Sequence, residues 1–148
     1  MGLIDDLGAG PVGLDTPAFI HYIEENPRYL PLVEPVFQAL DAGVLEGVTS
    51  AITLLEVLVV PYRSGNTPLA ERYEALLTRG RGLRLFDLTR PLLRAAARLR
   101  ATTGLKTPDA LQVAAALSAG STTFVTNDDR WPEEVAGLRI AQLEGYLG

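Results

Sequence analysis

Residues 12–20, VGLDTPAFI, predict a strand that is followed at once by a helix. Val12 to Asp15 is a short apolar run that ends in an acid, and Pro17 suits the first turn of a helix. The alternation continues along the chain, with further strands expected at about residues 44–49, 83–88, 122–126 and 138–143. Strands that alternate with helices favour a three-layer α/β/α fold around a central five-stranded parallel sheet.

The expected helices begin at proline or hydroxyl residues and mostly end at glycine. They cover about residues 31–42, 50–60, 67–78, 89–104 and 107–120, besides the helix that starts at Pro17. Ser50 is the expected cap of the helix over residues 50–60, and residues 61–65 are expected to break it.

The chain has 148 residues, of which 47% are hydrophobic, and this predicts a single domain over residues 12–148 after an N-terminal tail at residues 1–11. It contains no cysteine, which excludes disulfides and thiolate metal sites and favours a cytoplasmic location. Residues 110–127 carry no charge, but Gln112 and Gly120 interrupt them, so we expect no membrane span.

Glu56 is the only charged residue in the apolar stretch at residues 50–60. Burying an ionised carboxylate there is unfavourable unless a cation or a water-filled cleft compensates for it. Asp15 and Asp128 are expected at the carboxyl ends of strands, and Asp109 at the start of a helix on the same edge of the sheet. Four converging carboxylates repel one another unless a divalent cation lies among them, and oxygen ligands favour Mg²⁺ or Mn²⁺.

Each aspartate alone also has a simpler explanation. Asp109 is favoured near a helix N-terminus by the helix dipole, Asp128 can stabilise a turn, and Asp15 can cap a helix. Taken together, the four acids predict a metal site that is suited to phosphodiester hydrolysis. The net charge of −5 argues against a general nucleic-acid binder, but this objection weakens if the four acids share a metal.

Four stretches carry a resemblance to a known family: residues 13–20, 50–58, 107–111 and 124–128. They are similar, in order, to the four acidic motifs of PIN domains, most closely to those of VapC-type toxins of bacterial toxin-antitoxin pairs. The resemblance spans about residues 12–143. Two departures are that Pro17 stands where such domains often have a small polar residue, and that Asp129 beside Asp128 leaves the fourth acid uncertain, although the Thr-Asn-Asp match favours Asp128.

The resemblance implies a Mg²⁺- or Mn²⁺-dependent endoribonuclease, the toxin of a type II toxin-antitoxin system. It implies that Asp15, Glu56, Asp109 and Asp128 hold the metal, and that Thr16, Thr126, Asn127 and Asp129 support these ligands or touch substrate. It also implies an RNA substrate and a cognate antitoxin. Separately, we expect a homodimer, in which Tyr22, Tyr29, Val36 and Phe37 contribute either to the dimer face or to the core.

Arg90, Arg94 and Arg98 recur every fourth residue and so form a stripe along one helix. This stripe could contact RNA phosphates or an acidic partner segment, or simply face solvent. Three functional alternatives stay open: an RNA-processing nuclease without an antitoxin, a non-catalytic interaction module, and a receiver-like phospho-switch.

Overall fold

The protein, described by a computed structural model over residues 2–148, is built on one six-stranded sheet of order β3-β2-β1-β4-β6-β5. The strands are β1 (Val12–Leu14), β2 (Gly47–Ser50), β3 (Leu83–Phe86), β4 (Thr123–Thr126), β5 (Glu134–Val135) and β6 (Leu138–Gln142). Every neighbouring pair is parallel except β5 with β6. The predicted α/β fold is confirmed, and the antiparallel two-residue β5 is a sixth strand that was not expected.

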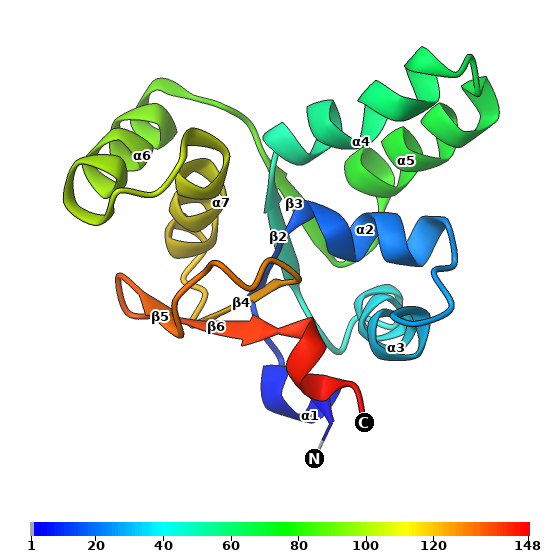
Figure 1. Ribbon diagram of the computed structural model, residues 1–148, viewed down its shortest axis with the longest axis horizontal. Helices are drawn as coiled ribbons and strands as arrows, with labels where there is room; N and C mark the ends of the chain where they lie inside the picture. Colours follow the sequence, from blue (N-terminus) through cyan, green and yellow to red (C-terminus); the bar gives the residue numbers. More distant parts are fainter. Residues whose placement is uncertain (1) are drawn as a thin grey trace.

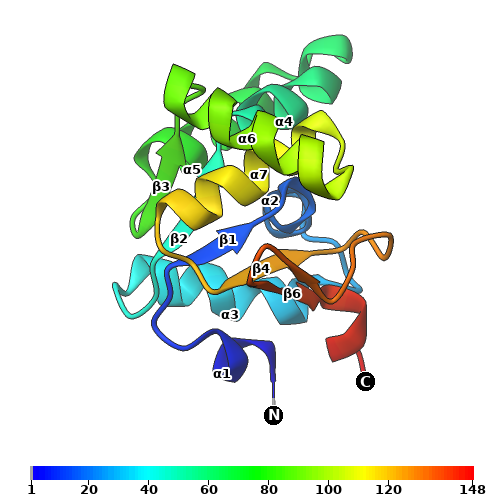
Figure 2. The same ribbon diagram turned by 90° about the vertical axis from the view of Figure 1, so that its left-hand side faces the viewer.

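Helices cover both faces of this sheet (Figure 1). The helices are α1 (Leu3–Leu7), α2 (Thr16–Ile23), α3 (Leu30–Asp41), α4 (Ile52–Arg63), α5 (Thr67–Arg79), α6 (Arg90–Thr103) and α7 (Thr107–Ser118), with a final 3₁₀ turn η1 (Leu143–Tyr146). Helices α6 and α7 lie on one side, whereas α2, α3 and α5 lie on the other. Figure 2 looks from the first side and shows α7 lying over β1 and β2.

The order of the strands creates a switch point between β1 and β4. The chain moves outward from β1 to β2 and β3, and then returns across β1 to form β4 on its other side. Leu14 pairs with Val125, so β1 and β4 end side by side. Ligands in such sheets collect beyond the carboxyl ends of the strands at this kind of point, and the segments that follow β1 and β4 begin with Asp15 and Asn127.

Three apolar clusters hold the helices to the sheet, one with α2, α3 and α5 and two with α7. Phe19, Tyr73 and Phe37 are buried on the α2, α3 and α5 side, and small side chains such as Ala115 allow α7 to approach the other face closely. Val36 and Phe37 are core residues rather than part of a dimer face, whereas Tyr22 and Tyr29 are partly buried against the same core.

Three local expectations differ from the structure. Residues 3–7, inside the predicted tail, form α1, because its two leucines at Leu3 and Leu7 bury themselves against the core. Helix α4 ends inside the expected break at residues 61–65, but it first continues through Pro61 to Arg63, because a proline can be accommodated where one backbone hydrogen bond is given up. Ser50 is the last residue of β2, although its hydroxyl still accepts a hydrogen bond from the backbone N–H of Ile52 at 3.2 Å.

Within residues 2–148, none of the helices has the length and apolar character that crossing a lipid bilayer requires.

Candidate functional site

Asp15 lies where β1 passes into α2, and it is the N-cap of that helix. Its Oδ1 accepts a hydrogen bond from the backbone N–H of Thr16 at 2.9 Å, and its Oδ2 accepts one from the Thr126 hydroxyl at 2.7 Å. The side chain is buried, with 9% of its surface exposed. The cap explanation for Asp15 is therefore correct, and the second oxygen is in addition tied to β4.

Glu56 lies on α4, and its environment differs from the one that its sequence suggests. The helix is not mostly buried, since Leu55, Val59 and Val60 on it are exposed, as is Glu56 itself. Its Oε1 accepts a hydrogen bond of 2.5 Å from the hydroxyl of Thr16. Glu56 therefore keeps contact with water while it is held beside Asp15 through one threonine.

Asp109 lies in the first turn of α7, and Asp128 lies two residues beyond the end of β4. Both belong with Asp15 and Glu56 to the wall of one open pocket of about 400 Å³. Its complete lining is Asp15, Thr16, Pro17, Ile20, Glu56, Lys106, Pro108, Asp109, Gln112, Asp128 and Arg130. The structure thus brings all four predicted acids to one place, from four separate parts of the chain.

Burial and the charges in this pocket change the pKa values of the acids. Burial raises the pKa of Asp15 to about 6, against the lowering effect of its bonds from Thr126 and Thr16, and the nearby charges of Asp109 and Glu56 raise it further. The pKa of Asp109 is also raised, first by burial and then by Asp128. Two acids that resist ionisation beside other anions form a site that favours a cation.

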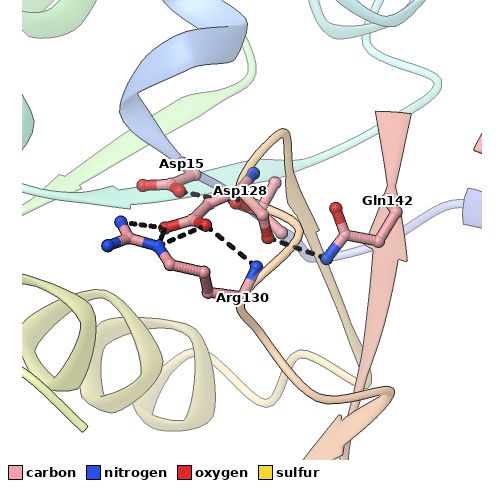
Figure 3. Close-up of polar contacts among 5 residues, drawn as sticks. Asp15, Asp128, Arg130 and Gln142 are labelled. Atoms are coloured by element: carbon pink, nitrogen blue, oxygen red, sulfur yellow. Dashed lines mark hydrogen bonds and ion pairs between the residues drawn. The ribbon is translucent and has the colours of Figure 1, made fainter. Parts of the chain in front are cut away.

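Asp128 is the exception, because it already has a positive partner. Arg130 bonds both of its carboxylate oxygens, with Nη2 at 2.7 Å from Oδ2 and Nε at 2.9 Å from Oδ1, and this holds the pKa of Asp128 below its ordinary value (Figure 3). Of the four acids, it alone forms an ion pair with Lys or Arg in the part of the chain that is described.

The four carboxylates share the pocket without already surrounding one point. Between residues 2 and 148 there is no group of three or more His, Cys, Asp or Glu side chains arranged to hold a metal ion. This agrees with the hydrogen bonds just described, because Asp128 is turned to Arg130 and Glu56 to Thr16. Ligation by all four acids would require these side chains to reorient.

A buried polar network lies directly beneath the acids. Gln112 donates to Thr53 Oγ1 at 2.7 Å, and its Oε1 accepts from the backbone N–H of Ser50 at 3.1 Å. Thr53 is also bonded to Thr49, at 2.7 Å, and to Thr16, at 3.4 Å. Sequence reasoning missed this network, although Thr53 precedes Glu56 by three residues and Gln112 follows Asp109 by three, which places each pair on one helix face.

The residues that follow β4 have different roles. The Thr126 hydroxyl bonds Asp15 and accepts from the backbone N–H of Asp128 at 3.1 Å, so it supports two of the acids. Asn127 faces His21 at 3.3 Å rather than the pocket, and Asp129 is exposed and does not line it. Trp131 is buried and stacks on Phe124 at 4.9 Å, which anchors this loop.

The arginine stripe of α6 lies outside this pocket. Arg90, Arg94 and Arg98 are exposed, and none of them forms an ion pair within residues 2–148. Arg98 lines a separate hollow between α6 and α7, together with Leu99 and Leu117. A role of the stripe in binding RNA or a partner stays a prediction.

Solved structures of similar fold include toxins and toxin-antitoxin complexes. VapBC2 from Rickettsia felis, bound to a DNA fragment from its promoter, is 16% identical, with a TM-score of 0.67, and the match covers 88% of this chain and 97% of that one. VapC20 from Mycobacterium tuberculosis, a toxin that cleaves the sarcin-ricin loop, is 14% identical, with a TM-score of 0.67 and coverage of 86% and 98%. DNA-bound VapBC from Salmonella typhimurium is 23% identical, with a TM-score of 0.62 and coverage of 89% and 97%.

These identities are low, so the likeness shows a shared fold. A search of curated proteins finds no match. The sequence model of the PIN domain, however, matches residues 12–138, which include all four acids of the pocket and most of the chain. The chain belongs to the PIN domain family.

Proposed function

We propose that the protein is a metal-dependent endoribonuclease that acts as the toxin of a type II toxin-antitoxin pair. The observation that carries this proposal is the convergence of Asp15, Glu56, Asp109 and Asp128 on one open pocket at the switch point of the sheet. Four carboxylates in one pocket are suited to a hard cation and are poorly suited to binding an RNA phosphate directly, since both are anionic.

The donor set fits Mg²⁺ or Mn²⁺. All four side chains offer carboxylate oxygens, which these ions prefer, and burial together with the nearby charges of Asp109 and Glu56 makes the negative charge of Asp15 unfavourable without a cation. Asp15, Glu56, Asp109 and Asp128 would hold the ion. When bound, it would supply an activated water for attack on phosphorus and would stabilise charge on the leaving oxygen.

The protein side chains would prepare the site for this chemistry. The bonds from Thr16 and Thr126 fix both oxygens of Asp15, and Thr16 also fixes Glu56. Beneath them, the network around Gln112 keeps α4 and α7 in register, so that Glu56 and Asp109 face the same space. Lys106, at the rim of the pocket, is placed to attract an RNA phosphate.

The structural neighbours support RNA as the substrate and an antitoxin as the partner. One of them is described as cleaving the sarcin-ricin loop, and others are toxin-antitoxin complexes. The family alone is compatible with RNA processing without an antitoxin, and the acid pocket alone is compatible with a catalytically inactive module. A protein partner is favoured over these alternatives by the surface of α4.

The exposed side of α4 is apolar beside the pocket. Leu55, Val60 and Tyr62 expose 60%, 61% and 65% of their surfaces, and Val59 exposes 42%. Exposed apolar side chains that cluster on a surface often mark a site where another protein binds. We place the antitoxin contact here, because a segment bound along α4 would also pass Glu56. The protein would also form a homodimer, through a face that does not include the buried Val36 and Phe37.

Cleavage of single-stranded RNA tests the function. The wild type should cleave with Mg²⁺ or Mn²⁺ and lose activity with a chelator, and Glu56→Gln and Asp109→Asn should each lower the rate by about 100-fold or more. Glu34→Gln, which alters an exposed glutamate on α3, is the matched control and should cleave normally. A wild type that is inactive with both metals, or an active Glu56→Gln variant, would overturn the proposal.

The partner surface is tested in cells. Production of the wild type should arrest bacterial growth, and co-production of a small DNA-binding protein encoded beside it should restore growth. Val60→Asp should still arrest growth but should no longer be rescued, whereas Val44→Asp, at an equally exposed valine outside α4, should be rescued normally. Rescue of Val60→Asp to the wild-type level would show that the antitoxin binds elsewhere.

A further inference from the structure

Arg130 contacts one acid of the pocket through two nitrogens of its guanidinium and through its backbone N–H. Its Nη2 lies 2.7 Å from Oδ2 of Asp128, and its Nε lies 2.9 Å from Oδ1 and 3.2 Å from Oδ2. The backbone N–H of Arg130 also donates to Oδ1, at 3.0 Å. Both oxygens of the carboxylate are therefore directed to one residue, and Figure 3 shows the guanidinium facing Asp128 with Asp15 nearby.

This contact opposes metal ligation by the same carboxylate. The guanidinium bonds both oxygens of Asp128 and holds a positive charge beside them, which disfavours the approach of a cation. Asp128 can join Asp15 and Asp109 as a ligand only if its side chain turns or the guanidinium withdraws. Arg130 and a divalent cation are thus competitors for one carboxylate.

Arg130 can leave Asp128 by a movement of its side chain alone. Its surface is 73% exposed, and within the described residues its guanidinium bonds no residue besides Asp128. The surrounding loop is fixed, because Gln142 donates to the backbone oxygen of Asp128 at 2.9 Å and Trp131 is buried. A released guanidinium therefore stays tethered at the rim of the pocket.

The rim of the pocket is where an RNA phosphate would approach. Arg130 and Lys106 are the cationic residues of the lining, above four acids. A guanidinium binds a phosphate with the same paired donors that it uses for a carboxylate, so the contact with Asp128 shows a geometry that is already suited to a phosphodiester.

We propose, building on the proposed nuclease function, that Arg130 exchanges partners: it pairs with Asp128 in the metal-free protein and binds the RNA phosphate once a metal ion has taken Asp128. The exchange makes Arg130 a substrate-binding residue whose contribution depends on the metal. It also sets the order of the two binding events, because metal binding releases the side chain that then binds RNA.

Two measurements on Arg130→Ala have opposite expected signs. In calorimetric titration with Mn²⁺ alone, the variant should bind the ion about two- to fivefold more tightly than the wild type, since an exposed ion pair no longer competes. In anisotropy measurements with a fluorescent single-stranded RNA and Ca²⁺ in place of the activating ion, it should bind RNA on the order of tenfold more weakly. With a chelator instead of Ca²⁺, the RNA affinities of variant and wild type should agree within about twofold.

Two control variants separate this exchange from simpler effects. Lys106→Ala removes one positive charge from the same pocket, so a general field effect would weaken RNA binding equally with chelator and with Ca²⁺. Arg28→Ala removes an exposed ion pair of the same 2.7 Å length, with Glu144, outside the pocket, and should change neither affinity. Arg130→Lys, which keeps the charge but not the paired donors, should recover less than half of the lost RNA affinity.

Unchanged or weaker Mn²⁺ binding in Arg130→Ala would overturn the proposal, as would a loss of RNA affinity that is the same with chelator and with Ca²⁺. If these results came with normal RNA cleavage by the wild type, only the exchange would be wrong. A wild type that neither binds Mn²⁺ nor cleaves RNA would instead refute the nuclease function, and the exchange with it.

Discussion

Replacing Asp15 by asparagine should stabilise the metal-free protein at neutral pH. The pKa of Asp15 is about 6, against 3.8 for an unperturbed aspartate. At about 1.4 kcal/mol for each pKa unit, the ionised side chain costs the fold about 3 kcal/mol at pH 7. Asparagine is neutral and can keep both contacts, since its oxygen can accept from the Thr16 N–H and its amide can donate to the Thr126 hydroxyl.

The expected gain is close to this amount, about 3 kcal/mol, because the pKa of about 6 already contains the effect of both hydrogen bonds to the carboxylate. The direction of the pH dependence follows from proton linkage. A carboxyl whose folded pKa is raised binds its proton more tightly in the folded state. Its contribution to the stability of the fold is therefore fully present below about pH 4 and is lost as the pH rises to about 6. The stability difference between Asp15→Asn and the wild type should therefore grow from near zero at pH 4 to its maximum at pH 7.

Urea unfolding in the presence of a chelator, at several pH values between 4 and 8, measures this difference. Added Mn²⁺ should reduce this difference, and at about a thousand times the dissociation constant it should invert it, because the ion then stabilises the wild type by about 4.1 kcal/mol and the variant by much less. Asp87→Asn, at an exposed position outside the pocket, should show neither effect. If Asp15→Asn is no more stable than the wild type at pH 8, or if the difference does not depend on pH, the electrostatic reasoning is wrong.

Three further predictions concern the support of the site. Gln112→Leu should destabilise the protein by about 2 kcal/mol in thermal unfolding, because it removes the side-chain oxygen that accepts from the buried N–H of Ser50 and one of the bonds to the hydroxyl of Thr53; a neutral effect would show that the network does not support the pocket. Gly13→Ala should cost about 3 kcal/mol or more, since an added Cβ would lie 2.4 Å from Cδ1 of the buried Phe124, and normal expression with an unchanged melting temperature would contradict this packing. Millimolar Mn²⁺ should raise the melting temperature of the wild type by several degrees, whereas the absence of any shift would count against a metal site.

The sequence predicts the fold well because its local signals agree with one another. Pro17, Pro68, Pro91 and Pro108 each lie in the first turn of a helix, and the apolar runs between the helices are the parallel strands. The sixth strand was missed because two residues carry no periodicity. The exposed side of α4 was missed for another reason: an apolar run indicates burial, but it does not show whether another part of the same chain covers it.

The four acids could be predicted as one site from the edge of the sheet on which they lie, and the structure places them around one pocket. Their individual environments could not be predicted. Arg130 follows Asp128 by two residues, and only the turn of the loop shows that its guanidinium faces the carboxylate. Glu56 suggested a buried charge, whereas the burial that raises a pKa belongs mainly to Asp15, which looked like an ordinary helix cap.

The anomalous diffraction of Mn²⁺ in crystals of the wild-type protein would show directly whether these acids hold one metal ion. We expect an anomalous-difference peak in the pocket, at about 2.0–2.6 Å from carboxylate oxygens of at least three of Asp15, Glu56, Asp109 and Asp128, with the guanidinium of Arg130 withdrawn from Asp128. A pocket without a peak at saturating Mn²⁺, with Asp128 still paired to Arg130, would contradict it.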